Sequence, residues 1–264
     1  MLFLNSHLDP LKNFLAESHL NSCSDLVLLP SGTHIACSQT TAKQIILWDA
    51  GQSTPNGFLV INQIQILQSI YPNFSPRELV VNEAYPSHIF IKNDNGVLGL
   101  DLALFKSMGI AEISHSFILP ADGNYSNFEF MIMQNALIVF IYSEEKTLIQ
   151  EFDLSVNQTN PPLVKQYSQF GHYTIEYEKN YKYVSRKTNK FFVIASNTLL
   201  IPELICFRSR AQGNDNYAHK FSLDSRRSKS FLAGVRSSAV NAELLFVFNE
   251  NATLFSFVEY DNYI

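Results

Sequence analysis

The 264-residue sequence has little charge and no long apolar run. Charged residues make up only 16% of the chain and aromatic residues 13%, a balance that excludes an intrinsically disordered protein. The longest apolar stretches, such as residues 136–142, are much shorter than the roughly 20 residues of a transmembrane helix. The first residues lack the basic flank of a secretory signal. We therefore expect a folded, soluble, intracellular protein, with cytoplasm and nucleus both open.

Cysteine is scarce as well. Cys23, Cys37 and Cys206 are odd in number, and their spacing matches neither a disulfide framework nor a zinc site. We interpret them as free thiols in a reducing compartment.

Reactive motifs are also lacking. The sequence contains no nucleophile elbow, zinc-protease motif, phosphate-binding glycine loop or dinucleotide fingerprint. None of the seven histidines stands at metal-ligand spacing from another histidine or a cysteine. We expect a protein that is not an enzyme and holds neither a cofactor nor a metal.

What the sequence does contain is a repeat. An alternating apolar segment ends at Asp49, Asp101 and Asp153, which are successively 52 positions apart. Phe207 stands at the corresponding place in the fourth unit, and Asp261 closes the fifth. A period of this length is typical of solenoids and propellers.

Each unit contains several short segments with the alternation and the β-branched and aromatic residues of strands. The first strands are expected at residues 25–29, 78–82, 128–133, 181–185 and 231–235. The second are expected at 34–38, 88–91, 137–142, 191–195 and 244–248, and the third at 44–49, 97–101, 148–153, 204–207 and a segment ending at 260–261. Fourth strands are clearest at 58–66, 114–119 and 219–223. This pattern predicts an all-β propeller of about five four-stranded antiparallel blades.

The first unit carries the most specific motif. Residues 25–39 contain two strands around a Pro-Ser-Gly turn, and the third strand ends in Trp48-Asp49, which resembles the WD40 repeat. The repeat period extends this resemblance over nearly the whole chain. The WD40 motif residues themselves are well matched only in the first unit and partly matched in the second. The repeats exceed the roughly 40–45 residues usual for WD40 units. Kelch repeats fit this length better, but the sequence has no Gly-Gly pair, so the kelch family ranks second.

The WD40 resemblance implies structural roles for several polar residues. In that family His, Ser or Thr, Asp and Trp link the strands of a blade by buried hydrogen bonds. The positions assigned to the repeat here are Trp48, Asp49, Asp94, Asp101, Asp153 and His172. His34 and His88 begin the second strands of their units, and we interpret them as structural too. The full WD40 set never occurs within one unit.

Residues 1–22 precede the propeller, which we assign to residues 23–264. Asp9 and Pro10 predict the start of a short helix, interpreted as a cap on the ring. The fifth unit ends before its outer strand. Either residues 1–5 supply that strand, as ring closure in WD40 propellers implies, or another chain does.

The net charge of −5 hides an asymmetry. Residues 1–180 carry 8 Lys and Arg against 17 Asp and Glu, whereas residues 181–236 carry 11 against 3. Candidate partner-binding residues in this basic third are Arg208, Arg210, Lys220, Arg226, Arg227 and Lys229. Such a cluster suits phosphates or an acidic protein surface, and the alternative is an ordinary solvated rim.

These observations favour a non-catalytic propeller scaffold that binds other protein subunits within a larger intracellular complex. The fold resemblance alone would not decide this, because propellers host many functions. The alternative hypothesis is a module that binds phosphate-bearing ligands, RNA or phosphoinositide, through the basic turns of units four and five. No membrane span is expected.

Overall fold

The structure is a computed structural model of the chain. It describes residues 23–32, 34–49, 58–62, 66–67, 74–103, 111–119, 125–143, 147–156, 160–167, 182–184, 190–196, 202–208, 219–222, 230–237, 242–249 and 254–260. The helix predicted near Asp9 and the strand proposed for residues 1–5 lie outside these residues. The chain forms two compact units: unit 1 comprises Met1–Ala121 and Leu154–Pro161, and unit 2 comprises Asp122–Asp153 and Pro162–Ile264.

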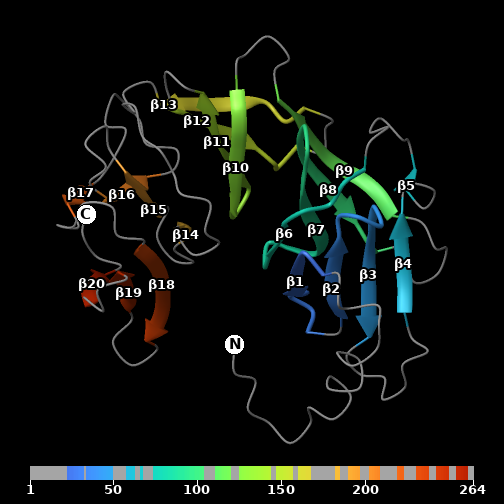
Figure 1. The fold of residues 1–264 in the computed structure, drawn as a ribbon, viewed down its shortest axis with the longest axis horizontal. Helices are drawn as coiled ribbons and strands as arrows, with labels where there is room; N and C mark the ends of the chain where they lie inside the picture. The colour runs from blue at the N-terminus through green and yellow to red at the C-terminus, as the bar shows by residue number, and fades with distance from the viewer. Residues whose placement is uncertain are drawn as a thin grey trace, which may run out of the picture. The chain divides into compact units, whose positions relative to one another are not determined.

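The described residues of unit 1 form two sheets (Figure 1). Sheet 1 has the order β1-β2-β3-β4 and is antiparallel throughout. Its strands are β1 (Asp25–Leu28), β2 (His34–Gln39), β3 (Gln44–Asp49) and β4 (Phe58–Asn62). Sheet 2 has the order β5-β9-β8-β7-β6. Its strands are β5 (Ile66–Leu67), β6 (Leu79–Asn82), β7 (Tyr85–Asn93), β8 (Gly96–Asp101) and β9 (Ala111–Ile118).

Unit 2 contains three antiparallel sheets in the described residues. Sheet 3 consists of β10 (Tyr125–Met133), β11 (Ala136–Ser143), β12 (Thr147–Asp153) and β13 (Leu163–Tyr167), in that order. Sheet 4 consists of β14 (Lys182–Val184), β15 (Lys190–Ser196), β16 (Pro202–Arg208) and β17 (His219–Ser222). Sheet 5 consists of β18 (Ser230–Ser237), β19 (Ala242–Asn249) and β20 (Leu254–Tyr260).

The predicted strands are confirmed. Every first, second and third strand expected from the repeat has a counterpart in the structure. The third strand of the first unit, predicted at residues 44–49, coincides with β3. Four-stranded antiparallel sheets that follow one another along the chain are the blades of a β-propeller, so the all-β fold class is also confirmed. The described residues contain no helix.

One tight turn requires glycine. Asp94 and Asn95 form the two-residue connection between β7 and β8, and Gly96 pairs with Asn93 at its base. A Cβ atom on Gly96 would collide with the carbonyl oxygen of Phe117 on β9. The absence of a side chain therefore lets β8 and β9 pair at this end of sheet 2.

Apolar residues that alternate along the strands form a core in each unit. In unit 1 the core joins sheets 1 and 2 and includes Ile45, Leu47, Ile89 and Leu98. In unit 2 the core joins sheets 3 and 4, where the rings of Phe191 and Phe207 stack with centroids 4.9 Å apart. Each of these sheets buries its apolar side chains against the adjacent sheet, because one sheet alone cannot cover its apolar faces.

Candidate interaction surface

The outer edge of sheet 5 is the clearest candidate docking surface. In the described part of the chain this sheet has three strands, and β20 is the outer one. It pairs with β19 over its full length, from Ala242↔Tyr260 to Phe248↔Leu254. In sheet 4 the corresponding outer position is filled by β17. An outer strand directs every second pair of backbone N–H and C=O groups away from its sheet, so β20 can accept a further strand.

Sheet 2 shows how this chain covers such an edge elsewhere. β5 pairs in parallel with the outer strand β9, through Ile66↔Ala111 and Leu67↔Glu112. Further along β9, the N–H of Asn160 donates to the carbonyl oxygen of Ser116 at 2.8 Å. The outer edge of sheet 2 is thus occupied at two places by segments of unit 1 itself.

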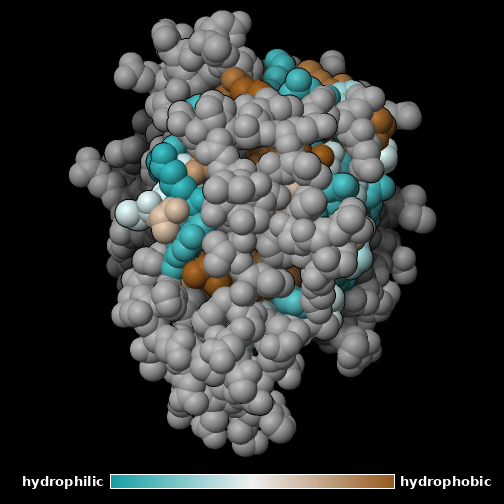
Figure 2. Space-filling view, turned by 90° about the vertical axis from the view of Figure 1, so that its right-hand side faces the viewer, coloured by the Kyte–Doolittle hydropathy of each residue, from teal (hydrophilic) through white to brown (hydrophobic). Residues whose placement is uncertain are grey.

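Exposed apolar side chains are scattered rather than gathered. Leu163 and Val164 on β13 are 50% and 47% exposed, and Leu28 on β1 is 53% exposed. On the face drawn in Figure 2, the brown areas of the described residues are visible as separate small areas. Scattered apolar residues of this kind are ordinary on a protein surface and do not by themselves mark an interface.

The structure describes two of the six basic residues predicted to bind a partner. Arg208 ends β16, where it pairs with Lys190, and Lys220 lies in β17 opposite Ile205. Arg208 and Ile205, the residue that faces Lys220, are three positions apart on β16, which is about 10 Å along the strand. Arg210, Arg226, Arg227 and Lys229 lie outside the described residues.

Two other basic residues of this region lie inside unit 2, Lys182 partly buried and Lys190 buried. The Nζ atom of Lys182 donates to the carbonyl oxygen of Phe130 at 2.6 Å, and it lies 3.6 Å from a carboxylate oxygen of Glu129. Lys190 is 8% exposed. These charges contribute to links within unit 2, so the count of basic residues in the sequence overstates the charge on the surface.

The described repeat positions of the first two units lie in or beside paired strands. Trp48 is buried in sheet 1 at 4% exposure. Asp49 pairs with His34 across β2 and β3, and Asp101 pairs with His88 at the equivalent place in sheet 2. The carboxylate of Asp101 lies 4.0 Å from His88 Nδ1 and accepts from the N–H of Ala103 at 2.9 Å.

The other repeat positions differ in their surroundings. Asp94 forms an ion pair with Arg77 at 2.7 Å, and both side chains are exposed. Asp153 ends β12, and its N–H donates to the carbonyl oxygen of Pro162 at 3.0 Å. His172 lies outside the described residues.

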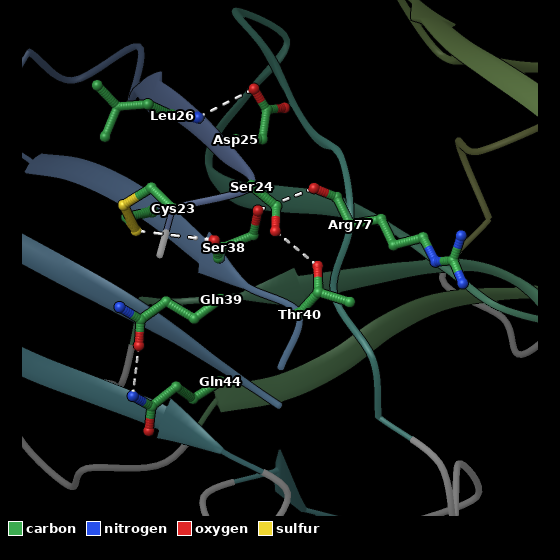
Figure 3. Close-up of a disulfide and its surroundings, with 10 residues drawn as sticks. Cys23, Ser24, Asp25, Leu26, Ser38, Gln39, Thr40, Gln44 and Arg77 are labelled. Carbon is green, nitrogen blue, oxygen red and sulfur yellow. Dashed lines mark hydrogen bonds between the residues drawn. A yellow bond between two sulfur atoms is a disulfide. The ribbon is translucent and has the colours of Figure 1, made fainter. Parts of the chain in front are cut away.

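Polar side chains of sheet 1 join it to sheet 2 (Figure 3). The hydroxyl of Ser38 donates to the carbonyl oxygen of Arg77 at 2.8 Å, and that of Thr40 donates to the carbonyl oxygen of Pro76 at 2.7 Å. The carboxylate of Asp25 accepts from the N–H of Leu79 at 2.8 Å. This last bond joins the innermost strands of the two sheets, β1 and β6. We refer to these three bonds as the sheet 1–sheet 2 junction.

Two histidines, His88 on β7 and His115 on β9, lie close together in sheet 2. His115 Nε2 is 3.0 Å from the carbonyl oxygen of Leu154, and the hydroxyl of Tyr85 donates to the same oxygen at 2.9 Å. The rings of His88 and His115 have centroids 6.1 Å apart. Burial lowers the pKa of both histidines, while Asp101 opposes this for His88 and the Leu154 carbonyl opposes it for His115. Burial therefore favours the neutral form of both rings.

The prediction of three free thiols is wrong for Cys23 and Cys37, which form a disulfide. Cys206 remains a free thiol and is buried in sheet 4. The disulfide joins the residue that leads into β1 to the middle of β2 (Figure 3). Only the register of β1 on β2, which pairs Leu26 with Cys37, brings the two sulfurs together. Sequence spacing gave no signal of this kind.

Comparisons with known proteins agree with the architecture. No family model and no curated protein matches the sequence. Among solved structures, Raptor from Chaetomium thermophilum is similar with a TM-score of 0.58 and 13% identity, over 89% of this chain and 20% of that one. The WD40 domain of Toxoplasma gondii coronin is similar with a TM-score of 0.53 and 9% identity, over 89% of this chain and 55% of that one.

These likenesses establish the fold. The chain has the fold of WD40 and related β-propellers. It spans a fifth of the Raptor chain and about half of the coronin chain, so it corresponds to one part of each. Within the described residues, no helix is long and apolar enough to cross a bilayer, and no three His, Cys, Asp or Glu side chains converge as a metal site would require.

Proposed function

We propose that this chain is a non-catalytic propeller scaffold that binds other protein subunits inside a larger intracellular complex. The observation that carries the proposal is the outer edge of β20, because an outer strand is a template for strand addition. We assign the propeller to residues 23–264 and a separate closing or capping role to residues 1–22.

Two sources for the added strand follow from this proposal. If residues 1–5 supply it, sheet 5 is complete in the isolated chain, and partners bind elsewhere on the propeller. If a partner supplies it, the edge of β20 is itself the binding site. Both arrangements satisfy the backbone groups of β20 with hydrogen bonds.

Amide hydrogen exchange on the isolated full chain separates the two sources. Closure by residues 1–5 predicts slow exchange along β20 that becomes fast when residues 2–5 are deleted. Addition of a partner strand predicts fast exchange on alternate residues of β20, which becomes slow only in the complex. Fast exchange that no co-purified protein slows would contradict docking at this edge.

A charge on the edge tests the scaffold role itself. Val258→Lys on β20 should reduce recovery of subunits in a native co-purification, because lysine on an edge strand opposes strand addition. Val164→Lys on the exposed strand β13 is the matched control and should leave recovery unchanged. Equal recovery with both variants, or no co-purified subunit at all, would count against the proposal.

A second candidate function is the binding of phosphate groups on RNA or a phosphoinositide. The observation that favours it is the basic balance of residues 181–236, in which Arg208 and Lys220 occupy neighbouring strands. Replacing Arg226, Arg227 and Lys229 by Glu should abolish salt-dependent binding to single-stranded RNA or to vesicles with phosphoinositide. Unchanged binding would remove this candidate.

A further inference from the structure

The Cys23–Cys37 disulfide lies where the sheet 1–sheet 2 junction is built. Cys23 leads directly into β1, and two residues later Asp25 accepts the hydrogen bond from Leu79 of β6. Cys37 precedes Ser38, whose hydroxyl donates to Arg77. The residue between Cys23 and Asp25 also takes part, because the hydroxyl of Ser24 is hydrogen-bonded to that of Thr40 at 2.8 Å. One covalent bond within sheet 1 therefore ties together the two segments, around Asp25 and around Ser38, that donate and accept the junction hydrogen bonds to sheet 2 (Figure 3).

We propose that this disulfide is a redox-responsive staple, which thiol reductants open and oxidants close while the protein stays folded in both states. When closed, it holds the start of β1 on β2 and keeps the junction with sheet 2 intact. When open, β1 and the junction loosen. The proposal does not depend on the partner or ligand suggested above.

The two cysteines differ in solvent exposure, so a reductant reaches one sulfur before the other. Cys23 is partly exposed, whereas Cys37 is 1% exposed. A reductant thiolate therefore attacks Cys23 Sγ, the Sγ–Sγ bond breaks, and Cys37 leaves as a thiolate that takes up a proton. A second reductant thiolate then releases Cys23, and the reductant is recovered as a disulfide. Two electrons pass from two reductant thiols to the two cysteines.

The reduced state has its own stabilising contacts. β1 and β2 remain paired through four residues on each strand, and the N–H of Ser24 donates to the carbonyl oxygen of Ser38 at 2.8 Å. Cys37 Sγ lies 3.8 Å from that same carbonyl oxygen, so its thiol finds an acceptor after reduction. The disulfide adds a constraint to strands that are already hydrogen-bonded, and its loss does not remove the sheet.

Two residues make the switch measurable. Trp48 is the single tryptophan of the chain, and it packs in the same apolar cluster as Cys37 and Cys23. A disulfide close to an indole quenches its fluorescence, so reduction should brighten Trp48. Cys206 is fully buried in sheet 4 and serves as an internal reference for a thiol that is present in both states.

The experiment equilibrates the full chain with glutathione at the ratios of reduced to oxidised form found in the cytosol and in the endoplasmic reticulum. Trapped thiols, counted after unfolding, should be three per chain at the first ratio and one at the second. In the reduced protein, alkylation under native conditions should modify Cys23 at least about ten times faster than Cys37. Trp48 emission should rise on reduction and return on oxidation, and it should not respond in a Cys23→Ser/Cys37→Ser variant.

Hydrogen exchange gives the structural readout. On reduction, the amide of Leu79 and those of β1 should exchange faster, while those of β11 in unit 2 stay protected. The Cys23→Ser/Cys37→Ser variant should match the reduced protein at both places, and Cys206→Ser should match the oxidised one. Three thiols at both glutathione ratios, or one at both, would overturn the proposal. So would unchanged exchange at Leu79, or loss of protection in β11 on reduction.

Discussion

His115 and Leu154 are 39 residues apart in the sequence, yet His115 Nε2 lies 3.0 Å from the Leu154 carbonyl oxygen. Leu154 begins the segment that returns to unit 1 after β10, β11 and β12 have formed part of unit 2. Tyr85 donates to the same oxygen. A buried carbonyl with two donors from β7 and β9 anchors this returning segment.

The histidine pair predicts a stability that falls in mild acid. Burial lowers the pKa of His88 and His115 below the ordinary value of 6.5, so the unfolded chain binds more protons than the folded one around that pH. The contribution of this pair to the free energy of unfolding should be constant above neutral pH and decrease as pH falls through 6.5. Denaturant unfolding at a series of pH values measures it. A His88→Gln/His115→Gln variant should lose much of this dependence, and an unchanged curve would refute the assignment.

Removing one donor to the Leu154 carbonyl should have a modest effect. Tyr85→Phe deletes the hydroxyl but leaves His115 as a donor, so we expect a loss of about 1 kcal/mol of stability. Tyr85→Phe combined with His115→Phe leaves the oxygen without either donor and should cost more than the two single changes together. A double-mutant cycle on unfolding free energies measures the excess, and simple additivity would argue against a shared role.

Gly96 and Gly32 form a matched pair for alanine substitution. Gly96→Ala places a Cβ atom against the Phe117 carbonyl oxygen and should destabilise sheet 2 by about 3 kcal/mol. Gly32 has a φ of +69° with no atom near the added Cβ, so Gly32→Ala should cost only about 1 kcal/mol of backbone strain. Thermal or denaturant unfolding of both variants checks the order, and a reversed order would show that the turn tolerates a shift of β9.

The largely buried pair of Lys182 and Glu129, with side chains 11% and 9% exposed, predicts an asymmetric response to mutation. Lys182→Met leaves the Glu129 carboxylate without this partner and should cost about 3 kcal/mol of unfolding free energy. Adding Glu129→Gln should recover part of that loss, because the remaining amide carries no charge. Lys165→Met, on β13 at the outer edge of sheet 3, which also holds Glu129, is the comparison for a general loss of lysine. No recovery in the double variant would mean that the packing of Lys182, rather than its charge, stabilises unit 2.

The repeat could be predicted because local pattern fixes it. Alternation in segments such as β11 and β12 follows from one buried face per strand, and the Asp residues mark strand ends at a constant period. The places of His34 and His88 could be predicted for the same reason, since both pair with the Asp that closes the next strand. The alternating strand pattern repeats in all five units, whereas the His–Asp pair occurs in the first two.

The contacts that define the candidate sites could not be predicted, because they depend on register and on chain return. Cys23 and Cys37 meet only through the pairing of β1 with β2. In the sequence, Lys182 is one of many basic residues. Its hydrogen bond to the Phe130 carbonyl depends on the packing of β14 beside β10, which no local pattern reveals. Nothing in the sequence near Leu154 indicates that its carbonyl would be bound by Tyr85 and His115.

The returning segment Leu154–Pro161 also sets an order for folding on the ribosome. Unit 1 includes residues that are synthesised after three strands of unit 2. Sheets 1 and 2 can form as they emerge, but the donors of Tyr85 and His115 lack their acceptor until Leu154 has left the exit tunnel. Unit 1 is therefore completed only after three strands of unit 2 have been synthesised, and a nascent chain halted before Leu154 leaves unit 1 without this contact.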